Sequence, residues 1–164
     1  MATKQTRTES DLIGALEIPM ECKYGVQTFR AIDNFPITGI GINRYPNIVK
    51  YLGVIKKAAA VANYETGKIS KEVYEGIVKA CDDVIAGKYN DQFPVDVIQG
   101  GAGTSTNMNA NEVIANVALE YMGHQPGQYE FCSPNDHVNG SQSTNDAYPC
   151  AVHLAMYADH LEMV

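Results

Sequence analysis

Two clusters of small hydroxyl and amide side chains, both between residues 99 and 149, have the residue types best suited to binding a polar ligand. They consist of Thr104, Ser105, Thr106, Ser143, Thr144 and Asn145. Hydroxyls beside a helix N-terminus can hold a carboxylate or phosphate, and an Asn carbonyl can accept from an ammonium group. Either cluster alone is more typical of an ordinary helix cap or turn. Together they favour one shared anionic ligand.

Other reactive side chains give weaker signals. His137 could act as a general base, although a single His in a polar loop is more often structural. Cys81 falls on an apolar helical stripe, which favours a small core residue over a nucleophile. The dinucleotide fingerprint G-x-G-x-x-G fails because Thr106 occupies the third glycine position, and no Walker motif or zinc spacing occurs. We therefore expect neither a metal site nor a cofactor.

Composition limits the classes of partner. A formal net charge of −7 argues against a general nucleic-acid binder, which needs a concentrated basic surface. No apolar run approaches the roughly 20 residues of a membrane span, so we expect no membrane partner. Four widely spaced cysteines without a C-x-x-C pair favour reduced thiols. These features predict a soluble, cytoplasmic protein.

Four helices are predicted to position the two clusters. Apolar periodicity, caps and breakers indicate helices over 46–67, 70–87 and 104–122, and a fourth opened by Pro149. Residues 1–11 are predicted to be a loose arm, and residues 12–19 and 24–29 to be short extended pieces with at most a small hairpin. Residues 34–44 read as a loop. The chain is thus expected to be mainly α.

The first helix is expected to bury one apolar stripe and to expose its lysines to solvent. The stripe comprises Ile48, Tyr51, Leu52, Ile55, Ala58, Ala59 and Ala62. Lys50, Lys56 and Lys57 could form an anion-binding surface, but a solvated helix face is the stronger interpretation. On the second helix, Val73, Ile77, Cys81 and Val84 should be buried.

The third helix carries a polar face in addition to its apolar stripe. The predicted stripe comprises Ala110, Val113, Ile114, Val117, Ala118 and Tyr121, and the polar face comprises Asn109, Glu112, Asn116 and Glu120. That face could contact solvent, another subunit, or the back of an active site. A surface position is the first expectation, although Asn is a poor choice for an exposed helix interior.

The composition changes near residue 140, which predicts two units. We expect residues 1–140 to form a mainly helical domain and residues 141–164 to begin a longer helical domain. The last helix reaches Val164 without a C-capping residue or a returning partner. The sequence is therefore interpreted as a segment truncated inside that second domain.

Three motifs resemble the first two signature regions of the aspartase and class II fumarase superfamily. They are G-G-A-G-T-S-T-N-M-N-A-N-E at 100–112, P-N-D-H-V-N at 134–139 and S-Q-S-T-N-D-A-Y-P at 141–149. The similarity extends through R-T-E-S-D-L-I-G near the start, so it covers nearly the whole chain. The resemblance implies the N-terminal domain of that fold and the start of its central long-helix domain.

Within the superfamily, the motifs are more similar to aspartases than to fumarases. Fumarases typically have G-T-Q-S-N-M-N and Q-S-S-N-D, where this chain has G-T-S-T-N-M-N at 103–109 and Q-S-T-N-D at 142–146. Fumarases also commonly have His before P-N-D, where this chain has Ser133. The implied activity is reversible elimination of ammonia from L-aspartate to give fumarate, without an organic cofactor.

By this resemblance, Thr104, Ser143 and Thr144 would bind the β-carboxylate and Asn145 would hold the amino group. The implied assembly is a homotetramer whose active sites draw on three subunits. The family's third signature, G-S-S-x-M-P-x-K-x-N, supplies the serine base and a substrate-binding Lys, and it has no counterpart in these 164 residues. We therefore expect the catalytic base to lie beyond Val164 and the isolated chain to be inactive.

Two alternatives remain open at this point. One is another superfamily lyase, especially a class II fumarase acting on malate. The other is a non-catalytic module, in which the clusters serve only anion binding or assembly.

Overall fold

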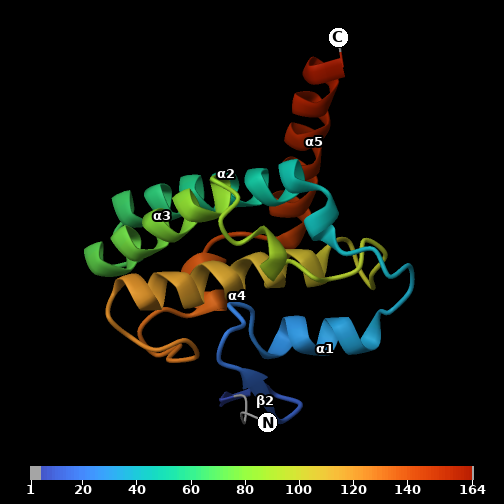
Figure 1. The fold of residues 1–164 in the computed structure, drawn as a ribbon. Coiled ribbons are helices and arrows are strands. Elements are labelled where there is room, and N and C mark those ends of the chain that lie inside the picture. The colour runs from blue at the N-terminus through green and yellow to red at the C-terminus, as the bar shows by residue number, and fades with distance from the viewer. Residues whose placement is uncertain (1–4, 164) are drawn as a thin grey trace.

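Residues 5–163 are described by the structure, a computed structural model, and they form a helical body with a small two-stranded sheet at one end (Figure 1). The strands are β1 (Thr6–Ser10) and β2 (Ala15–Pro19), which pair antiparallel. The helices are α1 (Val26–Asn34), α2 (Pro46–Glu65), α3 (Lys71–Ile85), α4 (Thr104–Tyr121) and α5 (Thr144–Met163). Shorter turns are η1 (Ile42–Arg44), η2 (Asn90–Gln92) and the π-helical η3 (Pro134–Val138).

Helix α4 lies at the centre of the body. In Figure 1 the α2–α3 pair covers one side of α4, α1 lies on the opposite side, and α5 projects away from the body. Every residue from Asn109 to Leu119 on α4 is buried. The core around it includes the fully buried Leu52, Ile77, Phe93 and Ile114. The first polar cluster therefore lies at the start of this buried central helix.

Three predicted helices are confirmed, with the expected local causes. Pro46 opens α2, where its missing N–H costs nothing. The Ser70 hydroxyl accepts from the Val73 N–H as the N-cap of α3. Helix α4 begins at Thr104, as predicted. On α3 the predicted stripe is buried: Val73, Ile77, Cys81 and Val84.

The N-terminal prediction is only partly correct. The small hairpin exists, but β1 occupies residues 6–10 of the predicted loose arm, and residues 1–4 of that arm lie outside the described residues. Residues 24–29 were predicted to be extended, yet Val26–Asn34 is the helix α1. Its N-cap is Gly25, which has no side chain to cap the helix, so the capping group must come from elsewhere.

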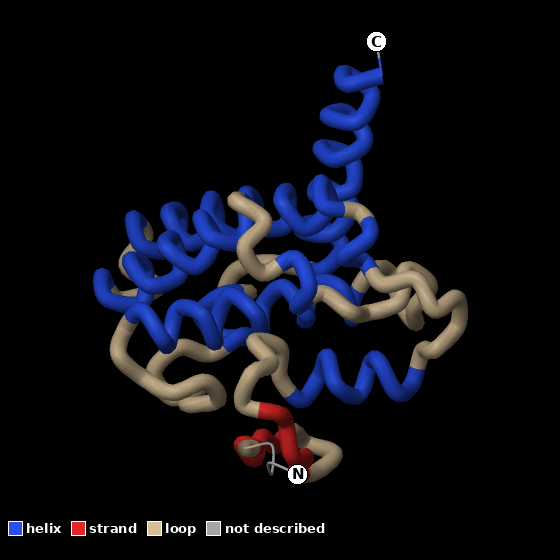
Figure 2. The backbone as a smooth tube through the Cα atoms, in the orientation of Figure 1, coloured by secondary structure: helices blue, strands red, loops and turns tan. Residues whose placement is uncertain are grey.

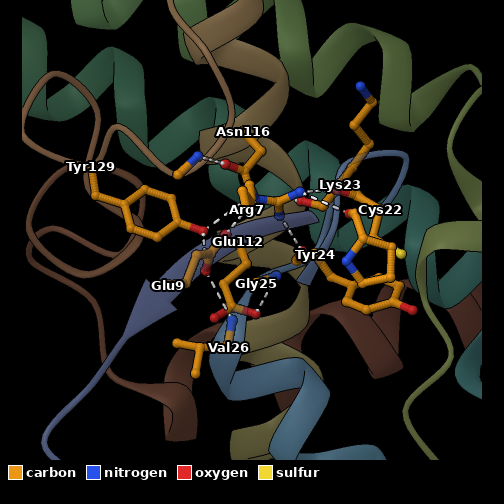
Figure 3. A network of polar contacts seen from close by, with 12 residues as sticks. Arg7, Glu9, Cys22, Lys23, Tyr24, Gly25, Val26, Glu112, Asn116 and Tyr129 are labelled. Carbon is orange, nitrogen blue, oxygen red and sulfur yellow. Dashed lines mark hydrogen bonds and ion pairs between the residues drawn. The ribbon is translucent and has the colours of Figure 1, made fainter. Parts of the chain in front are cut away.

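That capping group is Glu112, from the face of α4 expected to be on the surface. Its carboxylate accepts N–H bonds from Gly25, Gln27 and Thr28 at 2.8–3.0 Å. Figure 3 shows the network around it, in which the Tyr129 hydroxyl donates to Glu9. The surface prediction is therefore wrong for most of this face, because polar contacts with α1 and with other segments of the chain bury it.

The other members of that face follow the same pattern, with one exception. The Asn109 amide donates to the Gln92 carbonyl, and the Asn116 amide donates to the Lys23 carbonyl; both side chains are fully buried. Glu120 is exposed and pairs with Lys23. Tyr121, predicted to be part of the apolar stripe, is 47% exposed.

The buried face of α2 is rotated from the predicted stripe. Leu52 is buried as expected, but Ala58 and Ala62 are exposed. Lys56, predicted to be solvated, is 0% exposed. The buried positions on α2 are Val49, Leu52, Gly53, Lys56, Ala60 and Asn63. The prediction failed because polar partners from a distant loop cover Lys56 and Asn63.

Helix α5 begins five residues earlier than predicted. Pro149 lies inside the helix rather than opening it, so Thr144 and Asn145 belong to its first turn. The outer part of α5 carries exposed side chains, including Tyr157 and Met163, and Figure 2 shows this helix continuing away from the body. Of the helices in residues 5–163, none is long and apolar enough to cross a membrane.

Candidate functional site

The two polar clusters meet where the turn before α4 packs against the first turns of α5. Gly101 and Gly103 in this turn have φ of +77° and +85°, which favour glycine. The Tyr148 ring covers Gly103 so closely that an added Cβ would lie 2.2 Å from ring carbons. Glycine is thus needed at 103 both for backbone conformation and for the approach of α5.

A cavity of about 410 Å³ opens at this junction. Its lining comprises Val97, Ile98, Gln99, Gly101, Ala102, Gly103, Asn145, Tyr148 and Pro149. Of the four predicted binding residues, Asn145 lines the cavity, whereas Thr104, Ser143 and Thr144 belong to the adjoining helix starts. The cavity therefore lies between the turn before α4 and the first turns of α5, and Asn145 is the cluster residue that forms part of its wall.

Within the first cluster, Thr106 is hydrogen-bonded inside the protein, whereas Thr104 is available to a ligand. Gln99 accepts the Thr106 N–H at 2.9 Å and donates to the Thr106 hydroxyl, so Thr106 is committed to the fold. Thr104 is exposed. In the described part of the chain, no hydrogen bond links the Thr104 hydroxyl to a protein acceptor. Thr104 can therefore donate to a ligand beside the positive end of α4.

Within the second cluster, a residue of α4 forms a hydrogen bond with Thr144. The amide of Asn107, a buried α4 residue, donates to the Thr144 Oγ1 at 3.0 Å. Because that oxygen already accepts a hydrogen bond, its own hydrogen is left to point toward another acceptor. Ser143 Oγ accepts the Asn145 N–H at 3.2 Å, which forms a local turn.

Asn107 also connects the site to a buried polar network. Its amide nitrogen donates to Asn139 Oδ1 at 3.0 Å, and the same oxygen accepts from Lys56 Nζ at 2.9 Å. Lys56 Nζ donates in addition to Gln142 Oε1 at 3.0 Å. Burial lowers the pKa of Lys56 to about 7. Sequence reasoning missed Asn107, Asn139 and Gln142; Asn in a helix interior was the available signal for the first.

The weaker candidates behave as structural residues. His137 Nδ1 accepts the Ser133 N–H at 2.8 Å within the π-helical turn. Burial raises the pKa of the Cys81 thiol, which keeps it protonated in the core. Cys22, Cys81, Cys132 and Cys150 are all free thiols. Across residues 5–163, no group of three His, Cys, Asp or Glu residues is arranged to hold a metal ion.

Comparison with known families and proteins gives a consistent result. A family model described as "Lyase" matches residues 14–164. The chain is 62% identical over 150 residues to the aspartate ammonia-lyase of a Bacillus species, covering 92% of this chain and 32% of that protein. It is 54% identical over 159 residues to the aspartate ammonia-lyase of Escherichia coli K12, covering 96% of this chain and 33% of that protein.

Solved structures share the fold. The native fumarate lyase:delta crystallin structure from Brucella melitensis superposes with a TM-score of 0.92 at 52% identity, covering 94% of this chain and 36% of that one. A class II fumarase from Schistosoma mansoni gives a TM-score of 0.84 at 38% identity, covering 93% and 32%. The fold is thus that of the N-terminal part of such enzymes, and the chain spans about a third of the length of the curated relatives it matches.

Proposed function

The chain belongs to the lyase family, and from that premise we propose that it is the N-terminal part of an aspartate ammonia-lyase. The complete protein would convert L-aspartate reversibly to fumarate and ammonia. Similarity to aspartate ammonia-lyases at 54–62% identity supports this substrate over malate. Thr106 and Thr144 stand where fumarases typically have Ser, and they support the same choice.

The reaction requires strong stabilisation of negative charge. A base takes a proton from the carbon beside the β-carboxylate, and the released electron pair moves into that carboxylate to form an aci-carboxylate. The pair then forms the carbon–carbon double bond as the carbon–nitrogen bond breaks and ammonia leaves. Donors that are already oriented stabilise the intermediate because they need little reorganisation as the charge develops.

We assign that stabilisation to Thr104, Ser143 and Thr144, which would donate to the β-carboxylate. Asn145 would hold the substrate amino group through its side-chain carbonyl. The observation that carries the proposal is the Asn107 hydrogen bond to Thr144, which ties the α5 start to the α4 start beside one cavity. The serine base would come from outside these 164 residues.

Further parts of the proposal concern the whole protein. We place the domain boundary near residue 140, with residues 1–140 in the N-terminal lyase domain and 141–164 beginning the central helical domain. The complete protein would be a cytoplasmic homotetramer without an organic cofactor. Its four described cysteines, all unpaired, support a reducing compartment.

The decisive experiment follows fumarate by its ultraviolet absorbance in the complete protein supplied with L-aspartate or L-malate. Fumarate formation from aspartate, and much slower formation from malate, is expected. Thr144→Val should lower kcat/KM for aspartate by about 10²–10³-fold, the usual loss for one donor to a developing oxyanion. Thr66→Val, which removes a hydroxyl bonded only to its own helix end, is the matched control and should retain activity.

Preference for malate would instead identify a class II fumarase. Failure with both substrates would favour a non-catalytic anion-binding or assembly module. Full activity of Thr144→Val on aspartate would reject the assigned site while leaving the enzyme class intact.

A further inference from the structure

Lys56 is a buried cation without an acidic partner. Its side chain projects from α2 and is 0% exposed. Its hydrogen bonds go to two amide oxygens, Asn139 Oδ1 and Gln142 Oε1, and among residues 5–163 no carboxylate forms an ion pair with it. Burying an ammonium group is costly unless something compensates its charge. The amide dipoles compensate only part of that charge. Packing alone therefore does not explain why a lysine is buried at this position.

The first effect of Lys56 is to orient two amides. An ammonium group only donates, so it holds the oxygen side of both Asn139 and Gln142 toward itself. The Gln142 nitrogen is then directed to the Val138 carbonyl at 2.8 Å. The Asn139 nitrogen is directed to the Gln142 carbonyl at 3.3 Å. Lys56 thereby fixes the turn that leads directly into the second polar cluster.

The second effect reaches the site itself. Asn139 Oδ1 accepts from both Lys56 and Asn107, so Asn107 must present its nitrogen to that side. The same nitrogen donates to Thr144 Oγ1. A Thr144 oxygen that accepts this bond has its hydrogen free for a ligand. The ammonium group therefore determines which partner donates and which accepts in each hydrogen bond of the chain from Lys56 through Asn139 and Asn107 to Thr144.

We propose that Lys56 is a positioning residue of the candidate site, which orients Thr144 as a donor through Asn139 and Asn107 and supplies the positive charge that offsets a bound dicarboxylate. The inference rests on the proposed function, because it takes the ligand to be a dicarboxylate. It adds a source of positive charge to a site whose assigned side chains are all neutral.

Among the described residues, the groups packed around Lys56 supply no full negative charge in the free protein. Helix α3 presents Cys81, whose buried thiol stays protonated, and α4 presents the neutral Asn107. The neighbouring Lys57 pairs with Asp82 at the surface. Asp146 in the first turn of α5 is exposed, and η3 presents His137, which is bonded to the Ser133 N–H.

The consequence is a link between ligand binding and protonation. Burial lowers the pKa of Lys56 to about 7, so the free site loses its cation as the pH rises above neutrality. A nearby dianion favours the charged form and raises that pKa. Binding should therefore take up a proton above pH 7, and affinity for the dianion should fall as the pH increases.

The test measures binding of succinate, a dicarboxylate that cannot be eliminated, to the complete protein by calorimetry between about pH 6.5 and pH 8.5. The wild type should lose about tenfold in affinity over this range, as expected for a linked shift of one pKa unit or more. Lys56→Met should bind succinate at least about tenfold more weakly at the lower pH and show no proton uptake. KM for L-aspartate should rise in parallel. Lys57→Met, which removes a surface lysine from the same helix, should behave as wild type.

Asn139→Asp provides a second variant if Lys56→Met does not fold. It keeps an oxygen acceptor for Lys56 and Asn107 but adds a negative charge that cancels the cation. The ion pair that the new carboxylate forms with Lys56 should offset the lost hydrogen bond from the Asn139 nitrogen to the Gln142 carbonyl, so the variant should fold. It should still bind succinate about tenfold more weakly, without pH dependence. A purely structural role for Lys56 would leave succinate binding by this variant unchanged.

The outcomes separate the two proposals. If the wild type turns over L-aspartate while Asn139→Asp retains wild-type succinate affinity and pH dependence, the role of Lys56 is rejected and the proposed function stands. If the wild type neither binds succinate nor acts on aspartate, both fail.

Discussion

At the scale of single residues, the contact between Gly103 and Tyr148 decides whether the two helix starts can meet. Gly103 combines a φ of +85° with direct cover by the Tyr148 ring. A left-handed conformation costs a non-glycine residue roughly 1–2 kcal/mol, and forcing a side chain into filled space costs about 1–3 kcal/mol more. Two separate sequence motifs contain these residues, and neither motif reveals that they touch.

Gly103→Ala should therefore destabilise the complete protein by roughly 2–5 kcal/mol and strongly reduce activity, because α5 must move away from α4. Gly87→Ala is the matched control: its φ is +79° and an added Cβ has no neighbour within 4 Å. That control should lose only the roughly 1–2 kcal/mol of backbone strain. Chemical denaturation measures both changes.

A double variant isolates the clash. In a Tyr148→Ala background, Gly103→Ala should cost no more than Gly87→Ala does in the wild type, since the ring is gone. An equal cost of Gly103→Ala with and without the Tyr148 ring would show that the contact has no energetic weight.

Residue types and motifs singled out the two clusters, but did not predict the different contacts that their members make. Thr104 and Thr106 are the same residue type in one cluster. Thr106 is nevertheless buried and hydrogen-bonded to Gln99, whereas Thr104 is exposed. Lys56 and Lys57 are adjacent in sequence, yet only Lys56 is buried. The partners of Lys56 are 83 and 86 residues away, which is why helical periodicity could not predict its burial.

At the scale of elements, local signals predicted the helices that have local causes. Pro46, the Ser70 cap and the apolar stripe of α3 are all contained in their own segments. Helix α1 was missed because its N-terminus is capped by Glu112, more than 80 residues away. The same interaction explains why a charged residue lies in the middle of the buried helix α4.

Replacement of this cap should destabilise α1. Glu112→Gln puts an amide NH2 against backbone donors, so at least one of the three N–H groups loses its acceptor, at a cost of about 1–3 kcal/mol. Burial raises the pKa of Glu112, and the N–H donors oppose that rise. Denaturant unfolding and amide exchange of residues 26–34 would measure the effect.

The control for this prediction lies on the same helix. Glu120→Gln removes an exposed carboxylate that pairs with Lys23, and it should change stability by less than about 1 kcal/mol. If Glu112→Gln were equally mild, the carboxylate would not be the group that stabilises the start of α1.

At the scale of the whole molecule, the described residues form a buried core, and the proposed mechanism needs a base in addition to the binding groups they supply. Leu52, Ile77 and Ile114 lie on α2, α3 and α4 and are fully buried, whereas the outer part of α5 projects away from the body (Figure 1). The candidate binding groups, in contrast, are donors that can receive negative charge. No serine or lysine corresponding to the third signature lies within these 164 residues.

Folding and catalysis should therefore separate in the 164-residue polypeptide produced by itself. We expect a helical circular dichroism spectrum with cooperative thermal unfolding, because the core is assembled from its own helices. We also expect no fumarate from L-aspartate, since proton removal needs a base that the binding clusters do not supply. The complete protein, assayed in parallel, is the control. Fumarate formation by the purified 164-residue chain would contradict the prediction and place a base among the residues described here, whereas an unfolded spectrum would show that the core needs the remaining part of the protein.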